Sequence, residues 1–181
     1  MVLDSGWVTD WSAAIDGGAN VGEWTSMMAE RFSVVYAFEP APDTFEILKS
    51  NMVARNVVLS PMALLDRVTK VEVLSPSKKN PLDHRNRYVR EVFDGPVLST
   101  TIDALALKSC GLIKLDLEGA EYHALVGARE TLIRCRPALI VEVKRYTRRF
   151  GVEPERIIQL VNDAGYQCVM ARGVDQVFVP A

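Results

Sequence analysis

The sequence has few of the residues on which many enzyme classes depend. Its 181 residues include two histidines and three cysteines, and neither a Gly-x-Ser-x-Gly turn nor a Gly-Lys-Ser/Thr phosphate loop occurs. These absences argue against serine-hydrolase chemistry and against a P-loop nucleotide site. Cys110, Cys135 and Cys168 are odd in number and widely separated, so we expect reduced packing residues rather than a disulfide framework or a zinc ribbon.

Strong charge and long apolar runs are also missing. The net charge of −2 argues against a general nucleic-acid binder. No apolar run approaches the roughly 20 residues that a bilayer-spanning helix needs, and the first residues lack a basic start followed by an apolar stretch. Because 49% of the residues are hydrophobic, the chain can bury a substantial core. We therefore expect one cytoplasmic domain over residues 1–181, with no membrane role.

A glycine-rich turn is the most informative feature that is present. Asp16-Gly17-Gly18-Ala19-Asn20-Val21-Gly22 follows the apolar-leaning run 11–15 and precedes a helical pattern, which predicts a strand, a tight turn and a helix start. Glu39 ends the next apolar run. An acidic side chain at the tip of the second strand is placed to accept hydrogen bonds from both hydroxyls of a ribose. Together these features indicate a nucleotide-like cofactor.

The spacing of this turn partly separates two classes of cofactor. A dinucleotide turn reads Gly-x-Gly-x-x-Gly, and Ala19 stands where its second glycine would be. The spacing Asp-x-Gly-x-x-x-Gly instead suits the amino-acid end of S-adenosylmethionine, which carries no phosphate. A nicotinamide-dependent oxidoreductase and a plain turn without a ligand are the alternatives at this point.

Carboxylates follow two further apolar segments. The segment before Asp116 and Glu118 is typical of a buried parallel strand, and so is the segment before Glu142. Because the carboxyl ends of parallel strands line one crevice, we expect these side chains to converge there with Glu39.

Taken in order, these motifs resemble the FkbM-type methyltransferases from about Ser12 to the C-terminus. The resemblance rests on the glycine turn, Ala37-Phe38-Glu39-Pro40, Thr101-Ile102-Asp103, the run 113–121, and Arg136-Pro137 before Glu142. It implies the class I methyltransferase fold, an α/β Rossmann-like and mostly parallel sheet with helices on both faces and a C-terminal antiparallel hairpin. It also implies S-adenosylmethionine as the cofactor and, in many members, methyl transfer to a hydroxyl of a sugar-like or natural-product acceptor.

The resemblance and the spacing together assign the cofactor-binding residues. One group should cradle the methionine portion and order the turn, a second should hold the ribose, and a third should lie beside the adenine at the end of the third strand. The methionine group is Asp16, Gly18, Asn20 and Gly22, the ribose group is Glu39, and the adenine group is Met62 and Ala63.

Asp116 is the catalytic candidate nearest the transferring methyl group, with Glu118 and Glu142 beside it. Repulsion and burial would raise the pKa of at least one of these carboxyl groups toward general-base duty. A less favoured alternative keeps them ionised around Mg²⁺. In a third interpretation, Glu118 pairs with the ammonium group of the cofactor or with Lys114, and Glu121 only stabilises the start of the following helix.

Basic residues gather in two segments, the range 75–96, which we expect to be one long loop, and the residues after the Glu142 strand. One interpretation is a solvated surface. The other is an acceptor-side wall for an anionic small molecule such as a phosphorylated or nucleotide-linked sugar. A nucleic-acid end and a non-catalytic cofactor-binding module are less favoured alternatives. The residues assigned to the acceptor are Arg85, Arg87, Lys144, Arg148 and Arg149.

Hydrophobic periodicity predicts the remaining elements. The expected helices are 21–31, 42–54, 121–134 and 154–164, and the expected additional strands are 57–60, 70–74, 166–170 and 176–179. The last two strands form the closing hairpin, which a methyltransferase sheet requires and a doubly wound dinucleotide fold does not.

Overall fold

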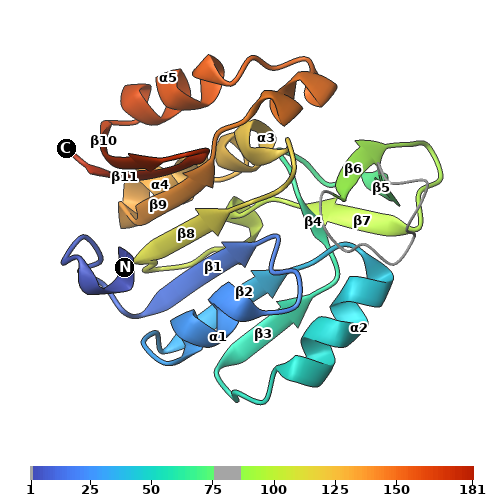
Figure 1. The fold of residues 1–181 in the computed structure, drawn as a ribbon, viewed down its shortest axis with the longest axis horizontal. Helices are drawn as coiled ribbons and strands as arrows, with labels where there is room; N and C mark the ends of the chain where they lie inside the picture. Colours follow the sequence, from blue (N-terminus) through green and yellow to red (C-terminus); the bar gives the residue numbers. More distant parts are fainter. Residues whose placement is uncertain (1, 76–86) are drawn as a thin grey trace.

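Apolar segments of the sequence form a seven-stranded sheet in the computed structural model, which describes residues 2–75 and 87–181 (Figure 1). Its strands are β1 (Ala13–Gly17), β2 (Val34–Phe38), β3 (Val57–Ser60), β8 (Leu112–Leu115), β9 (Ala138–Glu142), β10 (Tyr166–Arg172) and β11 (Asp175–Pro180). The order across the sheet is β10-β11-β9-β8-β1-β2-β3. The five strands from β3 to β9 are parallel, and β11 pairs antiparallel with both β9 and β10. The mostly parallel sheet with a closing hairpin is therefore confirmed.

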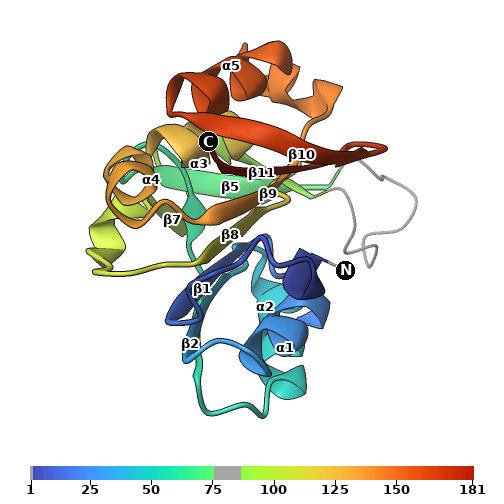
Figure 2. The same ribbon diagram turned by 90° about the vertical axis from the view of Figure 1, so that its left-hand side faces the viewer.

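Helices cover both faces of this sheet. They are α1 (Glu23–Ala29), α2 (Pro42–Asn51), α3 (Glu121–Val126), α4 (Arg129–Cys135) and α5 (Glu155–Asp163). Figure 2 shows α1 and α2 on one side of the sheet and α3 and α4 on the other. Met28 of α1 packs into one apolar core, and Leu125, Leu132 and Ile157 pack into a second core on the opposite face. Every residue of β1 and of β9 is buried, as expected for strands covered on both faces.

A second sheet lies beside the carboxyl ends of the parallel strands, at the right of Figure 1. Its strands are β4 (Ala63–Leu64), β5 (Lys70–Leu74), β6 (Tyr88–Glu91) and β7 (Val97–Thr100), in the order β4-β7-β5-β6. The range 75–96, expected to be one loop, thus contains β6. This part of the expectation is wrong because the segment pairs antiparallel with β5 and buries Val89. Residues 76–86 lie outside the described part of the chain.

The helix expected over 121–134 is divided into α3 and α4. Gly127 at the division lies against the linker that follows β4, where an added Cβ would be 2.2 Å from the Leu65 carbonyl oxygen. The Asp103 carboxylate then accepts the backbone N–H of Thr131 at 2.8 Å and caps the start of α4. A distant residue therefore supplies the cap that divides the predicted helix.

Two expectations from composition can also be checked. The three cysteines are free, and burial raises the pKa of the Cys110 thiol to about 12. Among the described residues, no helix combines the length and apolar character that crossing a bilayer requires.

Candidate active site

The glycine turn after β1 is held against the ends of β2 and β8. The backbone N–H groups of Gly18 and Ala19 both donate to the Phe38 carbonyl oxygen at 3.0 Å. Gly18 has a φ of +73°, and a Cβ added to it would lie 1.9 Å from the Asp116 carbonyl oxygen. Both the backbone conformation and the close approach therefore require glycine at this position. Gly22, with a φ of +99°, ends the turn where α1 begins.

Lys114 connects β8 to this turn through polar contacts. Its Nζ lies 2.9 Å from the Gly18 carbonyl oxygen and 3.1 Å from Oδ1 of Asp16. The other oxygen of Asp16 accepts the Thr25 hydroxyl at 2.6 Å. Burial lowers the pKa of Lys114, but the negative charges of Asp16 and Asp116 outweigh burial, so this pKa lies above its ordinary value. The sequence signal for this role is a lysine inside an otherwise apolar buried strand.

Glu39 lies just beyond β2 and accepts two backbone hydrogen bonds. Its carboxylate oxygens take the N–H groups of Asn20 at 3.0 Å and Ala41 at 2.9 Å. Burial raises the pKa of Glu39 above its ordinary value, although these two bonds act in the opposite direction. Each oxygen keeps a further acceptor position. Glu39 can therefore hold the turn and still accept bonds from a ligand.

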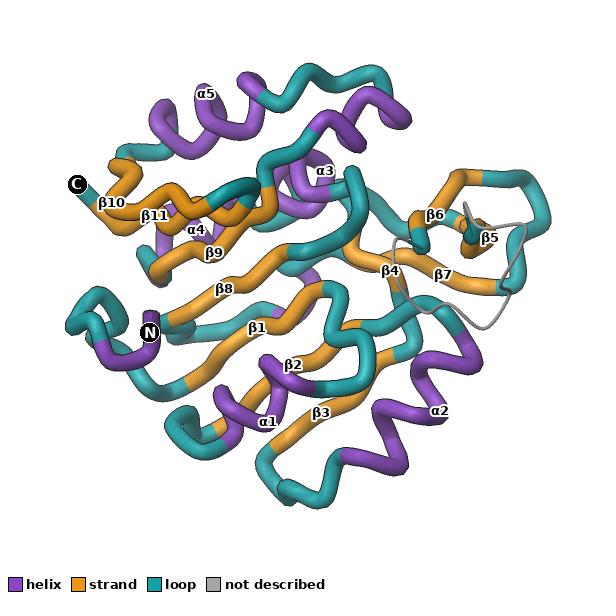
Figure 3. The backbone as a smooth tube through the Cα atoms, viewed as in Figure 1, coloured by secondary structure: helices purple, strands orange, loops and turns teal. Residues whose placement is uncertain are grey.

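The loops after β1 and β8 approach the second sheet at the carboxyl ends of the parallel strands (Figure 3). Residues of these loops and of the second sheet line a cavity of about 340 Å³. Val73 and Val89 of the second sheet form part of its wall. Asp16 and Gly22 are not in the wall, because the first is buried beneath the turn and the second lies at the start of α1. The predicted cofactor and catalytic residues that line the cavity are Gly18, Asn20, Glu39, Met62, Ala63, Asp116, Glu118 and Glu142.

Lys144 joins two of the predicted catalytic carboxylates. Its Nζ lies 2.5 Å from Oε2 of Glu142 and 3.0 Å from Oε2 of Glu118. Burial lowers the pKa of Lys144, but these two partners outweigh burial and place the pKa above its ordinary value. Burial and the neighbouring Asp116 raise the pKa of Glu142 to about 8. Asp116 itself is exposed at the cavity.

Glu121 has a larger part in the site than the helix-start role considered for it. Its Oε1 accepts the N–H groups of Leu117 at 2.8 Å and Gly119 at 3.2 Å, which fixes the loop between β8 and α3. Burial raises the pKa of Glu121 to about 7. Asp116, Glu121 and Glu142 each offer an oxygen, and these three atoms lie within 4.8 Å of one another. At such separations carboxylates can share a proton or a cation.

Of the four predicted acceptor residues that the structure describes, two line this cavity and two do not. Arg87 and Lys144 line the cavity, and both form ion pairs with carboxylates. Arg148 and Arg149 do not line it. Arg85 lies outside the described residues.

Comparison with known proteins decides the family. Residues 16–168 match the model of the methyltransferase FkbM domain. The chain belongs to the FkbM methyltransferase family. This FkbM domain is similar to 2-O-methyltransferase NoeI of Sinorhizobium fredii (strain NBRC 101917 / NGR234). The two are 28% identical over 122 residues, which are 56% of this chain and 50% of NoeI, so the match spans about half of that relative.

Solved structures agree with this fold. Methyltransferase FkbM from Methylobacillus flagellatus KT superposes with a TM-score of 0.60 and 19% identity, covering 93% of this chain and 43% of that one. Magnesium protoporphyrin IX methyltransferase from Synechocystis PCC 6803, solved with S-adenosylmethionine bound, gives a TM-score of 0.53 and 11% identity over 99% of this chain and 74% of that one. The FkbM domain therefore has the class I methyltransferase fold.

The close approach at Gly18 predicts that Gly18→Ala destabilises the FkbM domain far more than Gly151→Ala. Gly151 has a similar φ of +71°, but nothing lies within 4 Å of its added Cβ. The control should cost about 1–2 kcal/mol, the cost of a left-handed conformation alone. Gly18→Ala should cost several kcal/mol more by urea denaturation and weaken S-adenosylmethionine binding in calorimetry. Equal losses in the two variants would contradict the assigned contact.

The raised pKa of Glu121 predicts that the free energy of unfolding falls as pH rises, and that Glu121→Gln removes this dependence. The folded protein keeps this proton up to about pH 7, whereas an unfolded glutamate loses it near pH 4.3. The folded state thus binds more protons between these values, and stability falls as pH rises through this window. Urea denaturation at pH 4.5 and pH 8 should show the parent losing about 2–3 kcal/mol more than Glu121→Gln. Parallel pH dependences would show that Glu121 is ionised throughout.

Proposed function

We propose that this FkbM domain transfers the methyl group of S-adenosylmethionine to a hydroxyl of a small, sugar-like acceptor. The observation that carries the proposal is the meeting of the glycine turn, Glu39 and the acidic group around Asp116 in one cavity. The name of the similar 2-O-methyltransferase NoeI supports oxygen as the methylated atom. Membership of the FkbM family sets aside the nicotinamide-dependent alternative.

The cofactor side of the cavity has the groups that this cofactor needs. The side-chain oxygen of Asn20 is buried without a hydrogen-bond partner in the described part of the chain, so it can accept a bond from a ligand. Glu39 can accept both ribose hydroxyls, and Met62 and Ala63 offer apolar surface to the adenine. Bound S-adenosylmethionine supplies a methyl group that its sulfonium already activates.

Asp116 is our candidate for the base that takes the proton of the acceptor hydroxyl. It is exposed at the cavity, whereas Glu142 beside it is buried. Burial and Asp116 raise the pKa of Glu142 to about 8, so this pair favours a shared proton over two adjacent negative charges. Glu118 and Lys144 complete the wall on this side. A divalent cation between Asp116, Glu121 and Glu142 is the second candidate arrangement, favoured by the spacing of their oxygens.

The position of Glu39 predicts that Glu39→Gln weakens S-adenosylmethionine binding about tenfold or more. Hydrogen bonds to a charged acceptor contribute about 1.5–3 kcal/mol each, and glutamine retains only one oxygen acceptor. Glutamine is preferred to alanine because its one oxygen still accepts a bond from the N–H group of Asn20 or Ala41, whereas alanine would leave both without this partner. Calorimetric titration measures the affinity, and Glu46→Gln on the exposed face of α2 is the control. Unchanged affinity in Glu39→Gln would remove the ribose assignment.

The placement of Asp116 predicts that Asp116→Asn lowers kcat about 10²–10⁴-fold while cofactor affinity changes little. Asparagine keeps the shape of the side chain and loses the negative charge. The measurement is S-adenosylhomocysteine formation over a panel of hydroxylated acceptors, with and without a chelator. Turnover that withstands the chelator excludes the divalent cation, and full turnover in Asp116→Asn excludes both roles for this residue. An FkbM domain that binds the cofactor and methylates no acceptor would be the non-catalytic module.

A further inference from the structure

Among the four predicted acceptor residues that the structure describes, Arg149 differs from the others in its charge pairing. Arg87, Lys144 and Arg148 each form an ion pair with a carboxylate. Arg149 forms no ion pair within the described ranges, and its Nη1 donates to the Glu118 backbone carbonyl oxygen at 3.2 Å. Arg149 therefore brings a positive charge to the site that no carboxylate of the described chain offsets.

Two tyrosine rings contact this guanidinium. Its Cζ lies 4.3 Å from the ring centroid of Tyr88 and 4.1 Å from that of Tyr146. Tyr88 begins β6, and Tyr146 belongs to the 3-10 helix η3 (Arg145–Phe150) that follows β9. Cation–π contacts of this kind use the positive charge of the guanidinium and do not consume its N–H donors, of which one bonds the Glu118 carbonyl oxygen. The arrangement restrains Arg149 before any ligand binds, which reduces the entropy that binding would cost.

Arg149 lines a second cavity of about 250 Å³ that adjoins the first. Its wall includes the aromatic side chains of Tyr88, Phe150 and His123. Val89 of β6 lines both cavities. The bond from Arg149 to Glu118 also links the two, because Glu118 lines the first cavity. A ligand of moderate length can therefore contact both.

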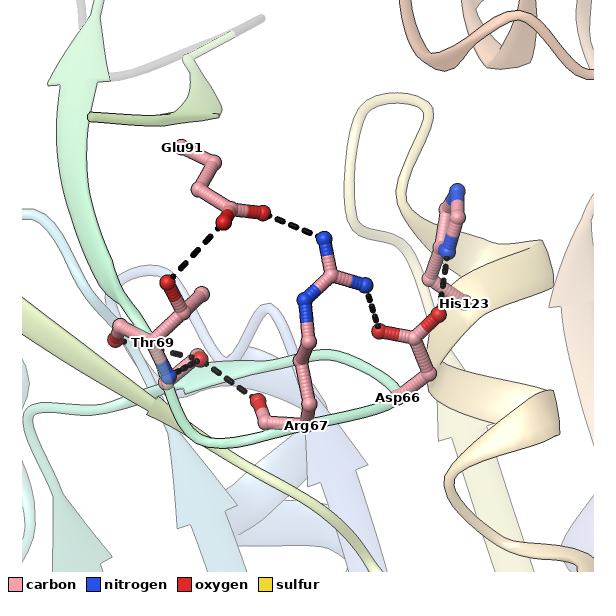
Figure 4. A network of polar contacts seen from close by, with 6 residues as sticks. Asp66, Arg67, Thr69, Glu91 and His123 are labelled. Carbon is pink, nitrogen blue, oxygen red and sulfur yellow. Dashed lines mark hydrogen bonds and ion pairs between the residues drawn. The ribbon is translucent and has the colours of Figure 1, made fainter. Parts of the chain in front are cut away.

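The other charged groups of the second cavity are held in polar contacts with one another or with a neighbouring strand (Figure 4). Nδ1 of His123 lies 2.9 Å from Oδ2 of Asp66, and Arg67 bridges Asp66 at 2.8 Å and Glu91 at 2.5 Å. Arg90 pairs with a glutamate of β5 at 2.5 Å. Asp66 and Glu91 share one cationic partner, Arg67, which reduces the repulsion that the two carboxylates exert on a bound anion. The unpaired charge of Arg149 is left as the attractive one.

We infer that Arg149 and the second cavity bind an anionic group of the methyl acceptor, a carboxylate or a phosphate, while the hydroxyl to be methylated lies near Asp116. This inference rests on the proposed function. A guanidinium edge binds the oxygens of either anion through paired, charge-assisted hydrogen bonds. The aromatic wall of Tyr88, Phe150 and His123 suits the apolar face of a ring. A sugar acid or a sugar phosphate is therefore the acceptor class that the second cavity fits.

The test compares Arg149→Gln with Arg148→Gln in the whole chain. Arg148 is the adjacent residue, is exposed, pairs with Glu153 at 2.8 Å and lines neither cavity. The protein is saturated with S-adenosylhomocysteine and titrated with glucuronate, glucose 6-phosphate and glucose. We expect at least one anionic sugar to bind the parent about tenfold or more tightly than glucose. Arg149→Gln should abolish that preference, Arg148→Gln should keep it within about twofold, and Arg149→Lys should restore it in part.

Each outcome of this titration supports or overturns the inference. Preference for glucuronate alone identifies a carboxylate, and preference for glucose 6-phosphate alone identifies a phosphate. The inference is overturned if neither anion binds the parent better than glucose, or if the two glutamine variants lose the preference equally. S-Adenosylhomocysteine affinity, measured in the same titrations, should be the same in all variants. If the parent does not bind S-adenosylhomocysteine, the proposed function itself fails, whereas cofactor binding and turnover of neutral acceptors alone would remove only the anion site.

Discussion

The buried ion pair between Lys114 and Asp16 is the interaction on which the cofactor side of the molecule depends. It joins the middle of one parallel strand to the end of its neighbour, and the same ammonium group holds the Gly18 carbonyl. Removing one partner of such a pair typically costs about 3–5 kcal/mol, because the other charge stays buried alone. The path of the turn follows from this anchor. So does the position of Asn20, whose backbone then reaches the Glu39 carboxylate.

Lys144 has the corresponding role on the acceptor side. It stands two residues beyond the end of the Glu142 strand, and it draws Glu118 and Glu142 together. The carboxylates around the cavity thus outnumber the two lysines, Lys114 and Lys144, that pair with them. Burial, together with the negative charge of Asp116, raises the affinity of the Glu121 and Glu142 carboxyl groups for protons.

The sequence predicts those parts of this site that follow from local patterns. Glu39, Asp116 and Glu142 each end an apolar run, and the convergence of parallel strand ends brings them together without further information. Lys114 is different, because its partners Asp16 and Gly18 lie in β1 and the turn after it, far away in the sequence. No local pattern around Lys114 specifies them. The charged residues of β6 give no clear pattern of alternating apolar positions, so the sequence does not predict this strand. It forms because the segment pairs with β5. The pairing of Arg87 with Asp43, separated by 44 positions, also depends on the tertiary fold.

The second sheet has a consequence for how this fold can diversify. It enters the chain between β3, an edge strand, and β8, whose neighbours are β1 and β9, so the ladder of the large sheet does not depend on it. Its strands nevertheless supply walls to both cavities. Lengthening or replacing this insertion can remodel the acceptor side while the glycine turn and its anchoring lysine stay unchanged. One catalytic scaffold could in this way serve chemically different acceptors over evolutionary time.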